Sequence, residues 1–304
     1  MKNRKYSLVF IMLLCMIMAV SAFPMTVNAD MGPKASVRIQ FEHMGDELCY
    51  GTLLSKEKST GPASAWDGRT ESAQKEYMDP GIWEIFVNYK DPDGYYFLQR
   101  SWKVSESKEL AWTYYPPDDF KILLYYPETE TFVSSGIYAR YAFDTYYTVD
   151  MDGVDIGSVE YNDDLSTNER IEAYRSYNYR QEMLALGARI VLTILIEMMV
   201  ALLFGFRQKK QLLILAVVNI ITQIILNVLL NVINYNSGPL AFTFFYVLFE
   251  LIVFALEAVL YCTILKRLSE KKKEDAYYIL YSFVANLISF GAGLFLAAKL
   301  PGMF

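Results

Sequence analysis

The sequence predicts a membrane protein of mixed α and β class: an extracytoplasmic β-sandwich-like domain, a stalk helix and a bundle of four transmembrane helices. Three observations lead to this fold. A signal-peptide pattern opens the chain, short alternating runs fill the part up to residue 160, and residues 183–304 are almost continuously apolar. The mean hydropathy of +0.18 over 304 residues averages these unlike parts.

Residues 1–29 have the pattern of a signal peptide. Three of the first five residues are basic, and an apolar run over residues 8–20 follows them. This run is too short to cross a bilayer, which distinguishes it from a membrane-spanning helix. Small residues after it form cleavage motifs, and we expect cleavage after Ala29.

Residues 30–160 are predicted to form the β-sandwich-like domain. Turn signals such as Asp-Pro-Asp-Gly at 91–94 separate short β-rich runs, and no helix is expected among them. A loop is expected at 56–75, and a helix from residue 169 to 181 should make the stalk, residues 161–182, continuous with the first span. The runs cover residues 37–41, 83–89, 95–104, 109–115, 120–126, 131–134 and 146–150.

The charge of the exported part excludes one class of partner. Residues 30–180 contain 27 acidic and 15 basic side chains, a net charge of −12. Nucleic-acid binding requires a basic surface, so no nucleic-acid partner is expected. Cys49 is the only cysteine in this part, so the domain is expected to be held by its core rather than by a disulfide. No cofactor is predicted.

Two features of this domain allow a structural and a functional interpretation. The acidic loops at 91–94 and 150–155 are candidate calcium sites, with Asp150, Asp152 and Asp155 as ligands, or ordinary turns, which we favour. The aromatic residues between strands are a candidate contact surface or part of the core, and the core is favoured. They are Trp112, Tyr114, Tyr115, Tyr125 and Tyr126.

Four apolar segments, at about 183–206, 211–233, 240–265 and 276–298, are each long enough to cross a bilayer. The positive-inside rule places the basic connectors in the cytoplasm, so the N-terminal domain and the C-terminus are expected outside the plasma membrane. The signal peptide requires the same orientation. The connectors carry Arg207, Lys209 and Lys210, and then Lys266, Arg267, Lys271, Lys272 and Lys273.

Polar side chains recur inside these segments, where they are costly and often functional. Helical geometry predicts two layers of them. Glu197, Glu257 and Asn219 share one depth and include no basic residue, whereas Arg189 can pair with Glu250 at the other. Interhelical hydrogen bonding is the structural alternative. The predicted intramembrane cluster consists of Arg189, Glu197, Asn219, Gln223, Asn227, Glu250 and Glu257.

Several stretches make the chain resemble a family of signal-peptide-bearing, four-helix membrane proteins common in clostridial Firmicutes. They are DMGPK at 30–34, LCYGTLLSK at 48–56, YYPP at 114–117, FKILLY at 120–125 and YARYAFDTYY at 138–147. The resemblance covers nearly the whole mature chain. It implies a Gram-positive plasma membrane and assigns no activity, substrate or catalytic residue.

Two functions from different classes remain open. The first is a non-enzymatic envelope protein whose β-domain binds a ligand or a membrane partner, with the helices as anchor or signal relay. The alternative is a small proton- or cation-coupled transporter, or a subunit of one, that uses Glu197 and Glu257 and forms a homo-oligomer or works with a partner protein. An enzyme is less favoured, because the only histidine, His43, lies outside the spans and no nucleophile or phosphate-binding motif is present.

Overall fold

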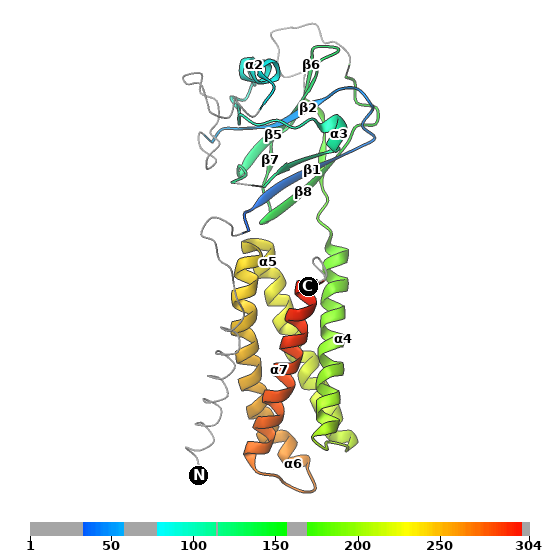
Figure 1. Ribbon diagram of the computed structural model, residues 1–304, viewed down its shortest axis with the longest axis vertical. Coiled ribbons are helices and arrows are strands. Elements are labelled where there is room, and N and C mark those ends of the chain that lie inside the picture. The colour runs from blue at the N-terminus through cyan, green and yellow to red at the C-terminus, as the bar shows by residue number, and fades with distance from the viewer. Residues whose placement is uncertain (1–32, 58–77, 114, 157–168, 300–304) are drawn as a thin grey trace. The chain divides into compact units, whose positions relative to one another are not determined.

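The computed structural model describes residues 33–57, 78–113, 115–156 and 169–299. These residues fall into two compact units, Pro33–Tyr177 and the segment that begins at Asn178 (Figure 1). The predicted signal peptide, most of the predicted loop at 56–75 and the first part of the predicted stalk lie outside the described residues.

The first unit contains two mixed β-sheets. The order of the first sheet is β10 (Ala173–Arg175), β8 (Asp144–Asp150), β1 (Ser36–Glu42) and β4 (Glu109–Trp112). The order of the second sheet is β3 (Tyr96–Phe97), β2 (Tyr50–Ser55), β5 (Asp119–Tyr126), β6 (Thr131–Ser135) and β9 (Glu169–Ile171), and β7 (Tyr138–Ala139) pairs with β5. Most pairings are antiparallel, whereas β1 with β8 and β6 with β9 are parallel.

One hydrophobic core lies between these sheets. Val37 and Ile39 of β1 are fully buried, while the alternate residue Gln40 is exposed, as the period of a half-buried strand requires. They share a cluster with Ile122 and Leu124 of the second sheet. A β-sheet domain that precedes apolar helices is therefore confirmed.

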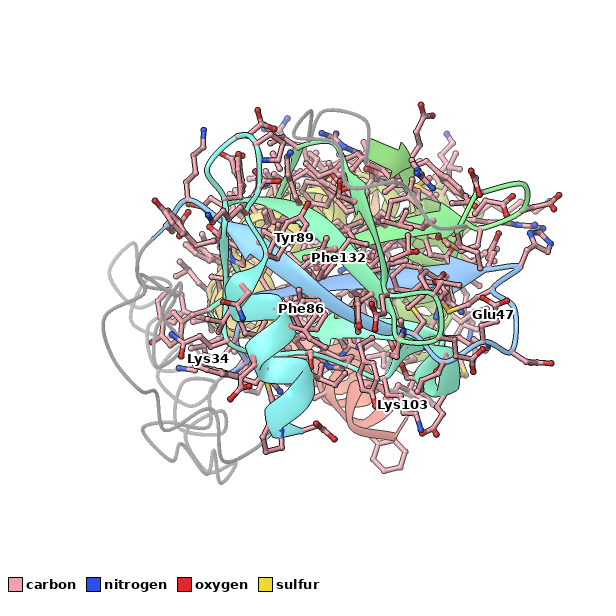
Figure 2. All side chains as sticks on the ribbon, turned by 90° about the horizontal axis from the view of Figure 1, so that it is seen from above. Lys34, Glu47, Phe86, Tyr89, Lys103 and Phe132 are labelled. Atoms are coloured by element: carbon pink, nitrogen blue, oxygen red, sulfur yellow. The ribbon has the colours of Figure 1, made fainter. Side chains whose placement is uncertain are left out.

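The strand predicted at 83–89 is wrong, and so is the expectation that the domain lacks helices. These residues belong to α2 (Pro80–Asn88), whose first turn is capped by Asp79: its Oδ1 accepts from the backbone N–H of Gly81 at 2.9 Å. The Asp-Pro start is a helix signal that the alternating apolar residues concealed. Phe86 of α2 packs against Phe132 on the outer face of the second sheet (Figure 2).

Two further segments of this unit differ from the prediction. Only Tyr96–Phe97 of the run at 95–104 is a strand, and the short helix α3 (Val104–Ser107) follows it. The helix expected from residue 169 to 181 is instead β9 and β10 up to Arg175, because β10 pairs with β8 and β9 with β6. Pairing with distant strands therefore overrides the local helix preference.

The second unit is helical. Its elements are α4 (Tyr179–Leu203), α5 (Lys209–Leu260), the π-helical segment η3 (Tyr261–Leu265), α6 (Lys266–Leu268) and α7 (Asp275–Lys299). Asn178 caps α4 by accepting from the N–H of Gln181. Within the described residues, three helices are long and apolar enough to cross a membrane, namely Tyr179–Leu203, Lys209–Leu268 and Asp275–Leu296.

The middle helix is interrupted at Gly238, whose backbone (φ 80°, ψ −179°) is not helical, and Pro239 follows it. Asn219 Nδ2 lies 3.4 Å from Tyr261 Oη, although 42 residues separate them. A straight helix would place residues that far apart at about 63 Å, at 1.5 Å per residue. The chain therefore folds back at Gly238, and the two parts of α5 lie side by side (Figure 1).

Candidate functional site

Three glutamates are buried among the apolar helices of the second unit. Glu197 lies on α4, and Glu250 and Glu257 lie on α5; their exposed fractions are 0%, 4% and 0%. Glu250 and Glu257 are seven residues apart, so they share one face of the helix. Burying an ionisable group among apolar side chains is costly, so three such groups in one unit call for a chemical explanation.

Glu257 is held by two other helical segments. Asn286 of α7 donates through Nδ2 to Glu257 Oε2 at 2.7 Å, and the hydroxyl of Thr222 lies 3.1 Å from Oε1. Asn286 is itself fully buried. The carboxylate of Glu257 therefore links both parts of α5 to α7.

Glu197 is less completely satisfied. Its carboxylate interacts electrostatically with Glu257, and the side chains of Asn219 and Ser289 are its polar neighbours. Neither carboxylate oxygen accepts a hydrogen bond of normal geometry from the described residues. Two adjacent carboxylates in a low-dielectric interior cannot both stay charged without a proton or a cation between them.

Two amide oxygens in this cluster also have no donor within the described part of the chain. They are Oδ1 of Asn219 and Oδ1 of Asn286. Their orientation is fixed, because the Nδ2 of Asn219 donates to the carbonyl of Leu215 and that of Asn286 donates to Glu257. Buried acceptors without donors mark a place for a proton, a water molecule or a cation.

A cavity of about 90 Å³ borders Glu250. One water molecule needs about 10–15 Å³ of accessible space, so the cavity has room for several. Arg189 lines it and lies over the ring of Phe242, 5.8 Å from the centroid, and Tyr246 is within hydrogen-bonding reach of Glu250. Its lining includes Arg189, Thr193, Gln223, Asn227, Tyr246, Glu250, Ser289 and Gly293.

The structure thus brings the seven residues of the predicted intramembrane cluster into one region. Glu197, Glu257 and Asn219 converge with direct or electrostatic contacts, and Gln223 and Asn227 bond to each other beside the cavity. Arg189 and Glu250 line the same cavity, and the ion pair between them stays a prediction. Asn286 was not predicted, because it is a single amide in an apolar helix and forms no polar face of the kind that Asn219, Gln223 and Asn227 form.

Most of the candidate aromatic residues belong to the core, which is the interpretation favoured from the sequence, and the alternative of a contact surface fails for three of them. Trp112 and Tyr126 lie in the core between the sheets, and Tyr125 packs beneath α2, with exposed fractions of 0%, 4% and 6%. Tyr115 is exposed, and Tyr114 lies outside the described residues. Tyr125 and Tyr126 are consecutive on β5 and therefore point to opposite faces, and both faces of this strand are covered, one by the core between the sheets and the other by α2.

The acidic loops act as turns and ion-pair partners. No group of three or more metal-ligating side chains occurs within the described ranges. Asp150 accepts from the N–H of Asp152 at 3.0 Å and contacts His43 Nδ1 at 2.8 Å. Gly153 has a φ of +74°, which fits the Asp-Gly turn interpretation.

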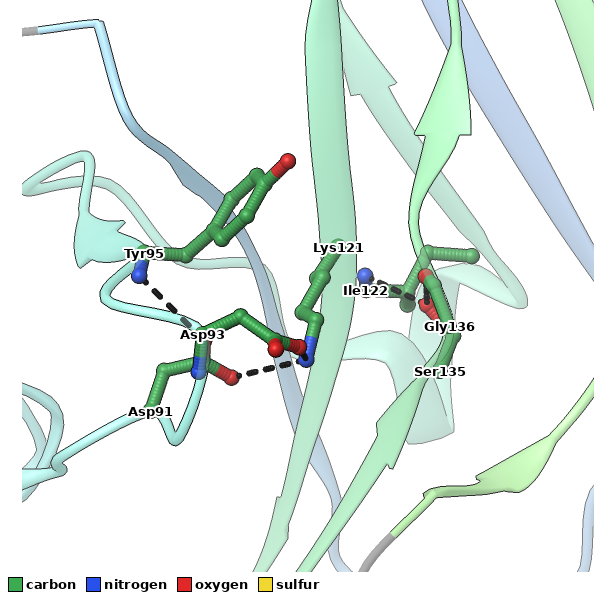
Figure 3. A network of polar contacts seen from close by, with 7 residues as sticks. All are labelled: Asp91, Asp93, Tyr95, Lys121, Ile122, Ser135 and Gly136. Carbon is green, nitrogen blue, oxygen red and sulfur yellow. Dashed lines mark hydrogen bonds and ion pairs between the residues drawn. The ribbon is translucent and has the colours of Figure 1, made fainter. Parts of the chain in front are cut away.

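In the other acidic loop, at residues 91–94, two aspartates form ion pairs with a buried lysine. Lys121 of β5 is fully buried, and its Nζ lies 3.1 Å from Asp91 Oδ1 and 2.5 Å from Asp93 Oδ2 (Figure 3). Asp91 Oδ2 also accepts from the backbone N–H groups of Asp93 and Tyr95. The loop that was a calcium candidate is therefore occupied by an ammonium group of the protein itself.

We expect the single histidine to titrate above its ordinary range. The hydrogen bond to Asp150 raises the pKa of His43, because the carboxylate stabilises the imidazolium. This contact therefore adds stability below the ordinary pKa of about 6.5, and the contribution is lost as pH rises through the raised pKa. NMR of the labelled histidine in the full chain measures the effect directly.

The Asp150→Asn variant should return the His43 pKa to its ordinary range. Asp46→Asn is the matched control, because Asp46 is exposed and is not among the carboxylates that act on His43. An unchanged His43 titration in Asp150→Asn would contradict the assigned pair.

Comparison with models of protein families, with curated proteins and with solved structures finds no match to this chain. The class of protein therefore follows from the fold and the site alone. A mixed β-sheet domain precedes apolar helices long enough to cross a membrane, which indicates a membrane protein.

Proposed function

We propose that the chain is a multi-pass plasma-membrane protein with an exported N-terminal domain. The two parts of α5, folded back at Gly238, count as separate crossings and bring the total to four. The basic turns at 207–210 and 266–273 support a cytoplasmic location for these ends, with the β-domain and the C-terminus outside.

We further propose that the helical unit is a proton- or cation-coupled transporter, or a subunit of one. The observation that carries this proposal is the convergence of Glu197 and Glu257 with Asn219 and Asn286. The carboxylate oxygens of Glu197 and the amide oxygens of Asn219 and Asn286 are buried and lack donors among the described residues. Carboxylate and amide oxygens suit a proton or a hard cation. Simple packing of helices requires no second carboxylate at this depth.

The arrangement suggests how a charge reaches the pair. Glu250 borders the cavity and interacts electrostatically with Glu257, about two helical turns further along the same face, and Glu257 interacts with Glu197. A proton or cation that enters the cavity would meet Glu250 first and the Glu197–Glu257 pair next. Four helices are few for a carrier, so the proposal includes a second copy or another membrane protein.

Ion flux in proteoliposomes tests this function. We expect Glu197→Gln and Glu257→Gln each to lower proton- or sodium-driven flux by about tenfold or more, since neither amide can take up a charge. Glu274→Gln is the control, because Glu274 is exposed and lies at the start of α7. Equal flux in all three variants and the unmodified protein would refute the transport proposal.

Binding of an envelope ligand by the β-domain, with the helices as anchor or relay, is the second candidate function. A polar pocket of about 400 Å³ on the outer face of the first sheet favours it. If flux is unchanged in both Glu197→Gln and Glu257→Gln, this non-enzymatic binding role becomes the better explanation. The pocket is lined by Arg38, Gln40, Glu42, Glu109, Tyr146, Tyr147, Thr148 and Ser176.

A further inference from the structure

A second pocket lies at the basic end of the helical unit, away from the buried carboxylates. It has a volume of about 270 Å³ and lies between the turn that joins α4 to α5 and the turn before α7. Its lining combines cationic, amide and aromatic side chains. The residues are Phe204, Gly205, Phe206, Arg207, Gln208, Gln211, Ser269, Glu270, Lys271, Lys273, Tyr277 and Tyr278.

The charge of this pocket is unbalanced. Arg207, Lys271 and Lys273 contribute three positive charges, against one negative charge from Glu270. All three basic residues are exposed, and none forms an ion pair with a carboxylate in the described part of the chain. By contrast, Lys266 nearby is paired with Asp275 at 2.8 Å. The pocket therefore presents cations that are available to an outside anion.

The walls of the pocket are held in place by hydrogen bonds. Gln211 Nε2 donates to Ser269 Oγ at 3.0 Å, and Tyr278 Oη lies 3.1 Å from the same oxygen. The hydroxyl of Tyr277 donates to the carbonyl of Phe204. Gly205 completes the turn with a φ of +79°, a conformation that favours glycine. The site is therefore formed before any ligand arrives.

The surroundings favour a lipid over a soluble anion. Leu203, at the end of α4 next to the pocket, is 85% exposed, and Leu202 is 48% exposed. These side chains belong to a helix long and apolar enough to cross a membrane. The lining also contains Tyr277, which is half-buried, and tyrosines are enriched at the level of lipid headgroups. An anion bound here would have apolar surface beside it for acyl chains.

We propose that this pocket binds the phosphodiester headgroup of an anionic phospholipid. Arg207, Lys271 and Lys273 pair with the phosphate, while the acyl chains lie against Leu202 and Leu203. Basic pockets between membrane helices bind anionic headgroups in this way. The inference does not depend on ion transport, because its residues are separate from the glutamates.

Lipid titration of the purified full chain in a neutral detergent tests the site. The probe is fluorescent phosphatidylglycerol, compared with fluorescent phosphatidylcholine and with inorganic phosphate as competitor. The pocket variant is Arg207→Gln/Lys271→Gln/Lys273→Gln. The control variant is Lys210→Gln/Arg267→Gln/Lys272→Gln, which removes the same charge from neighbouring positions at the same basic end without changing a lining residue.

We expect phosphatidylglycerol to bind the unmodified protein, and the pocket variant to bind it about tenfold more weakly or worse, since each basic residue near an anionic lipid is worth about fivefold. The control variant should change affinity much less. Three results would overturn the proposal: equal weakening in both variants, equal binding of phosphatidylcholine, or full displacement of the lipid by inorganic phosphate. Unchanged helical circular dichroism shows that each variant is folded.

Discussion

Replacing Lys121 with methionine is expected to destabilise the β-sheet domain by about 3–5 kcal/mol, the usual cost of breaking a buried ion pair. Both Lys121 and the side chain of Asp91 are fully buried. The variant therefore removes the cation that balances the Asp91 carboxylate, and solvent cannot reach the carboxylate to replace it. Asp93 is 45% exposed and keeps its hydration, so it contributes less. The double variant Lys121→Met/Asp91→Asn should recover much of the loss.

Tryptophan fluorescence during denaturant unfolding measures this effect within the full chain. All four tryptophans, at positions 66, 83, 102 and 112, precede the helical unit, so the signal reports only the β-domain. Lys103→Met is the matched control, because its pair with Glu106 is exposed and screened by solvent, so its loss should change stability much less. Similar losses of unfolding free energy in the two lysine variants would show that the buried ion pair of Lys121 with Asp91 contributes no more than an exposed pair.

The stabilisation from the ion pair between Lys121 and Asp93 depends on pH, and the sign of this dependence follows from the pKa of Asp93. The hydrogen bond from Lys121 lowers the pKa of Asp93 below its ordinary value of 3.8. The stabilisation is therefore present above that value and is lost as pH falls through the lowered pKa. Acid unfolding followed by tryptophan fluorescence should accordingly begin at a higher pH in Asp93→Asn, where this bond to Lys121 is weakened at every pH.

Gly293→Ala is expected to destabilise the helical unit by about 1–3 kcal/mol, the usual cost of an added methyl group that forces a neighbouring packed side chain to shift. A Cβ at this position would lie 2.6 Å from Tyr246 Oη, well inside contact distance. The ring of Tyr246 cannot move freely, because it packs on Phe290 with centroids 5.2 Å apart. Moving it would also disturb Glu250, so we expect lower ion flux.

Gly291→Ala is the control for this substitution. A Cβ at Gly291 meets no atom within 4 Å, so alanine should be neutral or stabilise the helix by about 0.5–1 kcal/mol. Circular dichroism at the helical band during thermal unfolding measures both variants. Gly293→Ala/Tyr246→Phe removes the clashing hydroxyl and should restore stability. If the two glycine variants behave alike, the close approach of α7 to Tyr246 is refuted.

Local sequence patterns predict much of the β-domain. The alternation of Val37 and Ile39 with polar residues places β1, because one face of a strand must be buried. The run at 83–89 has apolar residues at alternate positions, which favours a strand, but Phe86 between them is apolar as well, so the run also fits a helix. The cap at Asp79 and the packing of Phe86 on the second sheet select the helix.

In the helical unit, too, local patterns predict the elements, and tertiary packing determines which side chains meet. Apolar length predicts helices that can cross a membrane, since a bilayer requires about 20 such residues. Helical spacing also places Glu250 and Glu257 on one face of a helix. The apolar sequence around Glu197 indicates that burial of its carboxylate is energetically costly. Only tertiary packing shows that Asn286 of α7 reaches Glu257, because the rotation of one helix against another depends on side-chain contacts.

Hydropathy and residue period are local properties, so they predict the two-part organisation, the β-domain, the apolar helices and the glutamates that lie among them. The tertiary structure decided which strands pair, which aromatic residues are core, and that Asp91 and Asp93 hold Lys121 instead of a metal ion. These depend on contacts between residues far apart in the chain. Their energies come from burial and hydrogen bonding, which no local pattern records.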